Sequence, residues 1–211
     1  MAKEIEVKYL VSADYPTEGF NRHKLVIQWY LCTHEAHAVR VNMCVPFFYD
    51  KNGEHIYHSD EAFSKVNIKG PREMETRDEF EYEIPVKDAI AMINMSKGDN
   101  VIVKIRSHND ETNWDIDRYV DDNSGLIVAE KEYGSEEELR KDEIPDWCIR
   151  NITYEDRFYN RNLATDSFNK FPEADHLLKT IHGSLDEAKV YSHNMESYIF
   201  ELDAIIQKLK D

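Results

Sequence analysis

Charged side chains recur at every second position in several segments of this chain. The first segment, residues 4–8, reads Glu-Ile-Glu-Val-Lys. Successive side chains of a β-strand point to opposite faces, so its two carboxylates and its ammonium share one face. Same-sign pairs with this spacing follow at Glu79/Glu81, Lys104/Arg106, Asp115/Asp117 and Glu130/Glu132. Like charges repel, and a solvated sheet face has no reason to repeat that cost, so the pattern favours a charged interior.

The charge types on this interior face suit one class of ligand. Eight acids point inward by parity: Glu4, Glu6, Glu79, Glu81, Asp115, Asp117, Glu130 and Glu132. Seven bases share the face: Lys8, Arg40, Lys65, Lys69, Arg77, Lys104 and Arg106. Paired carboxylates are hard oxygen ligands for Mg²⁺ or Mn²⁺, whereas Lys and Arg bind phosphate oxygens. The two sets predict a metal-chelated polyphosphate inside a lumen that is close to neutral when empty.

Eight segments with period-2 alternation would position these side chains. The predicted strands are residues 4–9, 25–31, 38–43, 63–69, 77–84, 101–106, 114–119 and 126–133. In each segment, charged or polar residues alternate with apolar ones. Eight strands suit closure around the lumen of a small ligand. We therefore expect a closed eight-stranded β-barrel with a charged lumen and helices packed outside.

The composition excludes several classes of protein. The 211 residues are 41% hydrophobic and 32% charged, which suffices for one sizeable core. The formal net charge of −16 argues against nonspecific binding to nucleic acid or an anionic membrane. No apolar run reaches transmembrane length, and we expect no signal peptide. The three cysteines are widely spaced and indicate neither a disulfide framework nor a zinc site, so a cytoplasmic location is expected.

Many segments resemble, in order, the CYTH superfamily of triphosphate tunnel metalloenzymes. Residues 4–8 are similar to its N-terminal signature. The other similar segments are residues 26–31, 38–41, 66–70, 77–85, 104–106, 114–117, 125–132 and 152–160. The resemblance covers residues 1–163 and leaves 164–211 as a C-terminal helical extension. It implies an α+β fold whose eight-stranded barrel is an antiparallel triphosphate tunnel, with Mg²⁺ or Mn²⁺ as cofactor.

The resemblance, together with the charge pattern, assigns roles to individual residues. The candidate metal ligands are Glu4, Glu6, Glu79, Glu81, Asp117, Glu130 and Glu132. The candidate phosphate-binding residues are Lys8, Arg40, Lys65, Lys69, Arg77, Lys104 and Arg106. Tyr30 matches a family tyrosine that pairs with the lysine of the N-terminal motif. Lys8 and Tyr30 are therefore the candidate catalytic residues that activate water.

Three functions fit these residues. The first is divalent-metal-dependent hydrolysis of a triphosphate, either inorganic tripolyphosphate or a nucleoside or other organic triphosphate. The second is a class IV-type adenylyl cyclase, in which the ribose 3′-hydroxyl attacks the α-phosphorus of ATP and pyrophosphate leaves. The third is a noncatalytic protein that binds a triphosphate or nucleotide. Tyr30 favours hydrolysis over cyclisation, and the full set of acids argues against binding alone. The expected partner is a small-molecule triphosphate, with no nucleic acid and no membrane.

Two features depart from the family pattern. The third strand usually carries Arg-x-Arg, whereas this chain has Asn42 two residues after Arg40. One phosphate-binding cation is thereby lost. Residues 44–61 are longer than in short family members and contain an Asn52-Gly53 turn, which predicts an elongated hairpin. The alternative is a lid in which Phe48 or Tyr57 touches an organic group of the substrate.

Two further segments are predicted to be helical. Ser135 caps a helix that begins at Glu136, and Ser184 caps a longer helix that runs to Lys210. The apolar stripe of the longer helix would pack on the barrel exterior or on the partner in a homodimer. His34/His37 and His55/His58 lie in predicted turns without a third ligand, so a metal site is not expected there.

Overall fold

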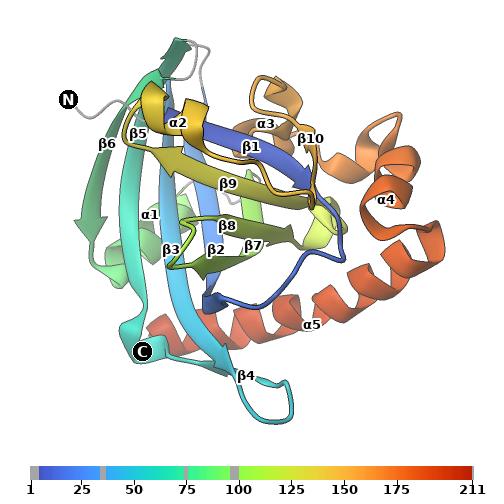
Figure 1. The fold of residues 1–211 in the computed structure, drawn as a ribbon. Helices are drawn as coiled ribbons and strands as arrows, with labels where there is room; N and C mark the ends of the chain where they lie inside the picture. The colour runs from blue at the N-terminus through green and yellow to red at the C-terminus, as the bar shows by residue number, and fades with distance from the viewer. Residues whose placement is uncertain (1–4, 34–36, 74–75, 96–99, 211) are drawn as a thin grey trace.

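The computed structural model describes residues 5–33, 37–73, 76–95 and 100–210, which fold around one antiparallel sheet (Figure 1). Its strands are β1 (Ile5–Val11), β2 (Phe20–Thr33), β3 (Ala38–Tyr49), β4 (His55–Tyr57), β5 (Phe63–Glu73), β6 (Thr76–Ile84), β7 (Val101–Asn109), β8 (Asp115–Tyr119), β9 (Ile127–Tyr133) and β10 (Cys148–Asn151). The order across the sheet is β10-β1-β9-β8-β7-β2-β3-β5-β6, and β4 pairs with β3. All eight predicted strands are present, and most extend beyond their predicted bounds.

The antiparallel α+β fold is confirmed, but the closed eight-stranded barrel was wrong. Two more strands, β4 and β10, bring the sheet to ten strands, and its described strands do not close into a ring. β10 pairs with the C-terminal half of β1, where Tyr9 faces Asn151 and Leu10 faces Arg150. β10 therefore occupies part of the edge of β1 that a closing strand would need. The sheet nevertheless curls strongly, so its concave side encloses an interior (Figure 1).

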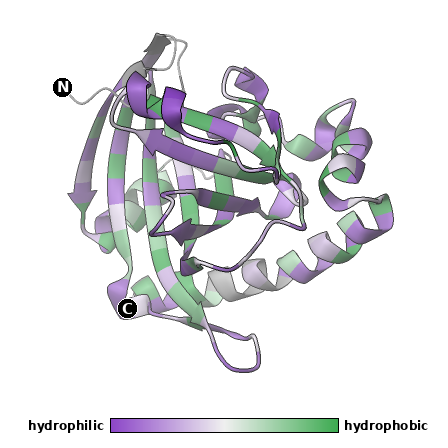
Figure 2. Cartoon of the chain, in the orientation of Figure 1, coloured by the Kyte–Doolittle hydropathy of each residue, from purple (hydrophilic) through white to green (hydrophobic). Residues whose placement is uncertain are grey.

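Helices flank the curled sheet on several sides (Figure 1). They are α1 (Val86–Met95), α2 (Glu136–Lys141), α3 (Asn160–Leu163), α4 (Ala174–His182) and α5 (Leu185–Lys210), with short 3₁₀ helices η1 (Ser59–Glu61), η2 (Asp121–Asn123), η3 (Asp156–Phe158) and η4 (Phe168–Lys170). Hydrophilic and hydrophobic residues alternate along several strands (Figure 2). The outward apolar side chains pack under the helices, and the inward charged ones remain for the interior.

Helix α5 confirms the predicted C-terminal helix and packs on the sheet. The Ser184 hydroxyl accepts a hydrogen bond from the backbone N–H of Glu187 at 3.1 Å. Met195, Tyr198 and Ile205 share one hydrophobic core with strand residues such as Leu25, Ile27 and Met43. The predicted cap of α2 is also present, since the Ser135 hydroxyl accepts from the N–H of Glu138 at 3.2 Å. The division into residues 1–163 and 164–211 stays a prediction, as does a homodimer.

The insertion at residues 44–61 forms the predicted hairpin. β3 continues to Tyr49, and β4 returns beside it with Phe47 facing Tyr57. The Asp50 carboxylate accepts hydrogen bonds from the N–H groups of Asn52 at 2.7 Å and Glu54 at 2.9 Å. Gly53 has a φ of +82°, which glycine adopts without strain. Neither Phe48 nor Tyr57 lines the chambers described below, so the hairpin geometry does not support the lid.

Candidate active site

The inward side chains of the curled sheet line two adjoining chambers. The first chamber has a volume of about 130 Å³ and is lined by Glu6, Lys8, Gln28, Tyr30, Ala38, Arg40, Lys69, Gly70, Lys104, Arg106, Glu130, Glu132, Tyr159, Asn160 and Arg161. The second chamber, of about 510 Å³, shares five of these residues and adds Ile5, Lys24, Val26, Asn42, Cys44, Phe63, Lys65, Glu79, Glu81 and Tyr133. Strands far apart in the sheet order thus face each other across a common interior.

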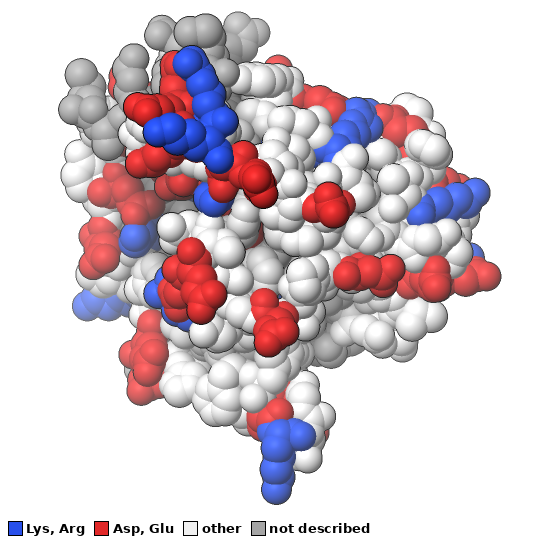
Figure 3. Space-filling model, viewed as in Figure 1, with Lys and Arg blue, Asp and Glu red and all other residues white. Residues whose placement is uncertain are grey.

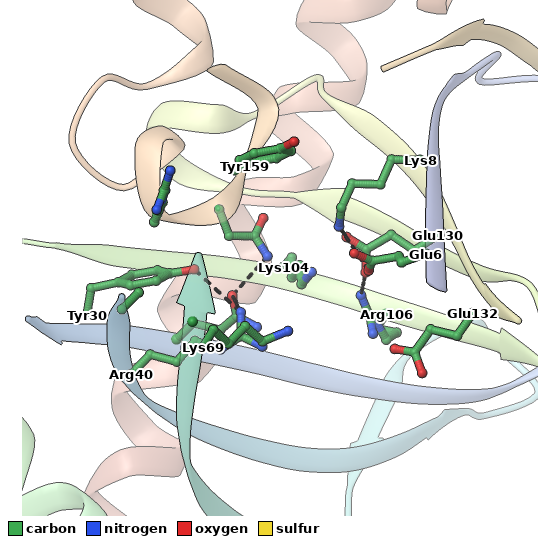
Figure 4. A pocket seen from close by; sticks show the side chains of 15 residues that line it. Glu6, Lys8, Tyr30, Arg40, Lys69, Lys104, Arg106, Glu130, Glu132 and Tyr159 are labelled. Atoms are coloured by element: carbon green, nitrogen blue, oxygen red, sulfur yellow. Dashed lines mark hydrogen bonds and ion pairs between the residues drawn. The ribbon is translucent and has the colours of Figure 1, made fainter. Parts of the chain in front are cut away.

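Glu130 on β9 is an acid of the first chamber that two bases hold. Its carboxylate accepts hydrogen bonds from Lys8 on β1 and Arg106 on β7 (Figure 4). In the sheet register Lys8 lies directly opposite Glu130. Burial opposes ionisation of Glu130, but the charges of Lys8, Lys104 and Arg106 outweigh it and hold the pKa of this carboxyl well below its ordinary value. Glu130 is therefore an anion held inside a basic cluster.

Lys104 and Arg106 on β7 are backed by two acids on β8. Lys104, only 1% exposed, pairs with the fully buried Asp117. The Arg106 guanidinium donates to Asp117 at 2.7 Å and 2.6 Å and to Asp115 at 3.0 Å. Burial and the neighbouring Arg106 lower the pKa of Lys104, against the attraction of Asp117 and Glu130. Neither aspartate lines either chamber. Asp117, a predicted metal ligand, pairs here with the two bases Lys104 and Arg106.

Tyr30 and Arg40 form a second group in the first chamber. The Arg40 guanidinium donates to the Tyr30 hydroxyl at 3.5 Å and to the Gln28 side-chain carbonyl at 3.4 Å. In Figure 4 Tyr30 lies beside Arg40, while Lys8 points at Glu130 and Glu6. Lys8 and Tyr30, the two candidate catalytic residues, therefore line the same chamber. The Tyr30 hydroxyl accepts a hydrogen bond from Arg40, and Lys8 bonds Glu6 and Glu130.

The second chamber contains a polar network that joins β3, β5 and β6. Asn42 donates to Asn67 at 2.6 Å, and Asn67 donates to Glu79 at 2.8 Å and to Glu81 at 2.6 Å. Lys65 pairs with Glu81 at 2.5 Å, and this bond raises the pKa of the lysine. Asn67 is fully buried. Asn42, where the family pattern has arginine, is thus one end of a neutral amide pair that leads to two carboxylates.

Lys69 connects the two chambers. Its ammonium lies 2.8 Å from the Glu79 carboxylate, and it lines both cavities. Two predicted site residues cannot be placed in this way. Glu4 lies outside the described residues, and Arg77 is described only through its backbone on β6.

The lining residues that the sequence did not predict include three consecutive ones near the C-terminal end of the sheet-forming region. Tyr159, Asn160 and Arg161 come from the start of α3, which follows the last strand. Asn160 donates to the Gln28 side chain at 3.0 Å and accepts from the buried Tyr119 hydroxyl at 2.5 Å. These residues lie in a short helix after a turn, where no period-2 pattern marks an inward face. Only their tertiary packing brings them to the chamber.

The chemistry of the donors fits Mg²⁺ or Mn²⁺, but the present arrangement does not gather them. Glu6, Glu130 and Glu132 offer hard carboxylate oxygens to the first chamber. In the described part of the chain, no three Asp, Glu, His or Cys side chains are arranged to hold a metal ion. Lys8 and Arg106 hold Glu130 instead. Metal ligation by these glutamates stays a prediction.

The electrostatics of the first chamber differ from those of the whole protein. The formal net charge is −16, and acidic side chains are scattered over the face shown in Figure 3. The described lining of the first chamber has six basic and three acidic side chains.

Within the described residues, no helix has the length and apolar content needed to cross a membrane.

The fold and the site define an α+β protein whose antiparallel sheet curls around an interior of basic and acidic side chains. No protein-family model matches the chain. It is 31% identical over 175 residues to an inorganic triphosphatase from Acetivibrio thermocellus, covering 82% of this chain and all of the relative. The fold is similar to the crystal structure of the inorganic triphosphatase NE1496, with a TM-score of 0.50 and 21% identity over 78% of this chain and 95% of that one. The chain belongs to the CYTH superfamily of triphosphate tunnel metalloenzymes.

Proposed function

We propose that this protein is a divalent-metal-dependent triphosphatase that hydrolyses inorganic tripolyphosphate in the first chamber. The observation that carries the proposal is the convergence of Lys8, Arg40, Lys69, Lys104 and Arg106 with Glu6, Glu130 and Glu132 on one small interior space. The bases offer donors for phosphate oxygens, and the acids offer oxygens for a metal. The relative named inorganic triphosphatase supports the same substrate class.

The residues of the chain would act mainly by positioning and by charge. Lys104 and Arg106 have little freedom, because Asp117 holds both. Fixed cations of this kind stabilise negative charge on phosphate oxygens without reorganising during the reaction. Glu6, Glu130 and Glu132 would hold the divalent metal, which would neutralise charge on the phosphates when bound. Arg40 would hold a phosphate beside the Tyr30 hydroxyl, and Lys8 and Tyr30 are the proposed activators of the attacking water.

Product analysis tests the proposal and separates it from its alternatives. Purified protein is incubated with tripolyphosphate or ATP, with Mg²⁺ or Mn²⁺ and with EDTA, and the products are resolved by ion chromatography. Release of orthophosphate from tripolyphosphate that depends on metal is the expected result. Cyclic AMP and pyrophosphate from ATP would show a cyclase, and tight binding without turnover would show a noncatalytic binder. Either of these outcomes would overturn the triphosphatase proposal.

A further inference from the structure

Arg161 brings to the first chamber a positive charge that pairs with no carboxylate in the described part of the chain. Its guanidinium makes no hydrogen bond or ion pair with any residue in the described part of the chain. Two other bases of the chamber are already paired with carboxylates. Lys8 pairs with Glu6 and Glu130, and Lys104 pairs with Asp117. A carboxylate beside a cation cancels part of the attraction between that cation and an entering anion. A guanidinium without a carboxylate partner therefore attracts the anion more strongly.

The segment that carries Arg161 is fixed in place by its neighbours. The preceding residue, Asn160, is bonded to Gln28 on β2 and to the buried Tyr119. Leu163, at the end of α3, is only 1% exposed and lies in the hydrophobic core. Arg161 itself is partly buried and lines the first chamber together with Tyr159 and Asn160. Its backbone is therefore held at the chamber while its side chain keeps its donors available.

We infer that Arg161 is a substrate-binding residue that binds a phosphate group at the α3 side of the first chamber. This inference rests on the proposed function, since it takes a triphosphate as the ligand. A guanidinium binds phosphate oxygens through two parallel hydrogen bonds, which lysine does not reproduce. In a protein with a net charge of −16, a free cation beside the chamber also offsets the repulsion that a polyanion meets on approach. Arg161 thus adds a cation to the interior of the sheet, whereas Asn42 replaces the arginine that the family pattern has there.

The test compares Arg161→Gln with a matched loss of charge elsewhere in the C-terminal region. Lys170→Gln is the control, because Lys170 is exposed on η4 and lines neither chamber. The dissociation constant of tripolyphosphate is measured by calorimetry without divalent metal, and KM and kcat are measured with Mg²⁺. We expect Arg161→Gln to raise both the dissociation constant and KM about tenfold or more, the order for one charge-assisted hydrogen bond, with kcat within about twofold. Arg161→Lys should restore part of the loss.

Thermal unfolding separates binding from a structural role. Because Arg161 has no partner in the described residues, its replacement should leave the unfolding temperature unchanged. An unchanged dissociation constant in Arg161→Gln, an equal loss in Lys170→Gln, or a fall in unfolding temperature that accounts for the loss would overturn the inference. These results concern the variants alone. Failure of the unaltered protein to bind or hydrolyse tripolyphosphate would instead refute the proposed function, on which the inference depends.

Discussion

At Glu130 three bases from two other strands surround one carboxylate, and each lowers its pKa against the effect of burial. The properties of single residues in this site thus depend on ion pairs in which both partners are buried. Removing one partner takes away part of the compensation of the buried charges that remain, which is costly for binding and for stability alike. The chamber residues are therefore tested by replacements that keep their shape.

Glu130→Gln keeps the volume of the side chain and removes its charge. We expect it to lower kcat/KM for tripolyphosphate by about a hundredfold or more, the order for loss of an electrostatic group in catalysis. Glu137→Gln on α2 is the control, because Glu137 is exposed and pairs only with Lys141 among the described residues. Chelation of metal by EDTA should abolish turnover in the unaltered protein. Full activity in EDTA would contradict the role of metal.

Tyr30→Phe removes one hydroxyl that Arg40 contacts in the first chamber. If this hydroxyl helps to activate water, kcat should fall at least tenfold while KM stays within a few-fold, the pattern of an interaction made mainly in the transition state. Steady-state kinetics with tripolyphosphate provide the measurement. A rise in KM with unchanged kcat would assign Tyr30 to holding Arg40 and the substrate instead.

At the scale of neighbouring strands, Asn42 takes part in a hydrogen-bond network that crosses β3, β5 and β6. Asn42 on β3 donates to Asn67 on β5, and Asn67 in turn donates to Glu79 and Glu81 on β6. Asn42→Arg would place a cation in the second chamber beside both acids. We expect it to lower KM for tripolyphosphate more than KM for ATP, because a nucleotide leaves fewer free phosphate oxygens. Equal responses of the two substrates, or none, would show that Asn42 does not tune substrate charge.

The outer face of β2 carries a histidine that should make stability depend on pH. His23 bonds the Ser107 hydroxyl at 2.9 Å and stacks on Phe47. Burial, then the charges of Arg118 and His55, lowers the pKa of His23 from 6.5 to about 4. The unfolded chain therefore binds a proton at a higher pH than the folded protein does. The stabilisation is complete above pH 6.5 and is lost as the pH falls towards 4.

His23→Asn keeps an acceptor or donor for Ser107 and removes the titrating group. In urea unfolding, the unaltered protein should lose stability between pH 6.5 and 4 by about 2 kcal/mol more than the variant does, allowing for partial solvent screening. Comparing the two proteins at each pH cancels the contribution of the other groups. Parallel stability curves across this window would contradict the role of His23.

At the scale of the whole molecule, the question is whether residues 164–211 fold independently of the sheet, and this depends on how tightly α5 packs on it. Met195 on α5 is 4% exposed and packs with strand residues, whereas Val190 on the same helix is 63% exposed. Met195→Ala should lower the free energy of unfolding by about 2–4 kcal/mol, and Val190→Ala by less than about 0.5 kcal/mol. Urea unfolding measures both. Two small and equal effects would mean that α5 is an appendage whose loss the sheet tolerates.

The sequence by itself determined the strands and the inward charges. Period-2 alternation is a local property, so residues 101–106 and 126–133 identify both the strands and the parity of Lys104, Arg106 and Glu130. Helix caps are equally local, and Ser184 was sufficient to predict where α5 begins. The order of segments also identified the family, which the relative from Acetivibrio thermocellus supports.

Only the tertiary structure decided which of these charges meet and whether the sheet closes. β10 was missed because it is four residues long, and its pairing with β1 is a long-range contact with no local pattern. Asp115 on β8 lies opposite Glu130 on β9, yet Glu130 lines the first chamber whereas Asp115 pairs with Arg106 and lines neither chamber. Arg161 reaches the chamber from a short helix whose position depends on Gln28 and Tyr119. Alternation sets the face of a side chain, but the curl and register of the sheet set its partner.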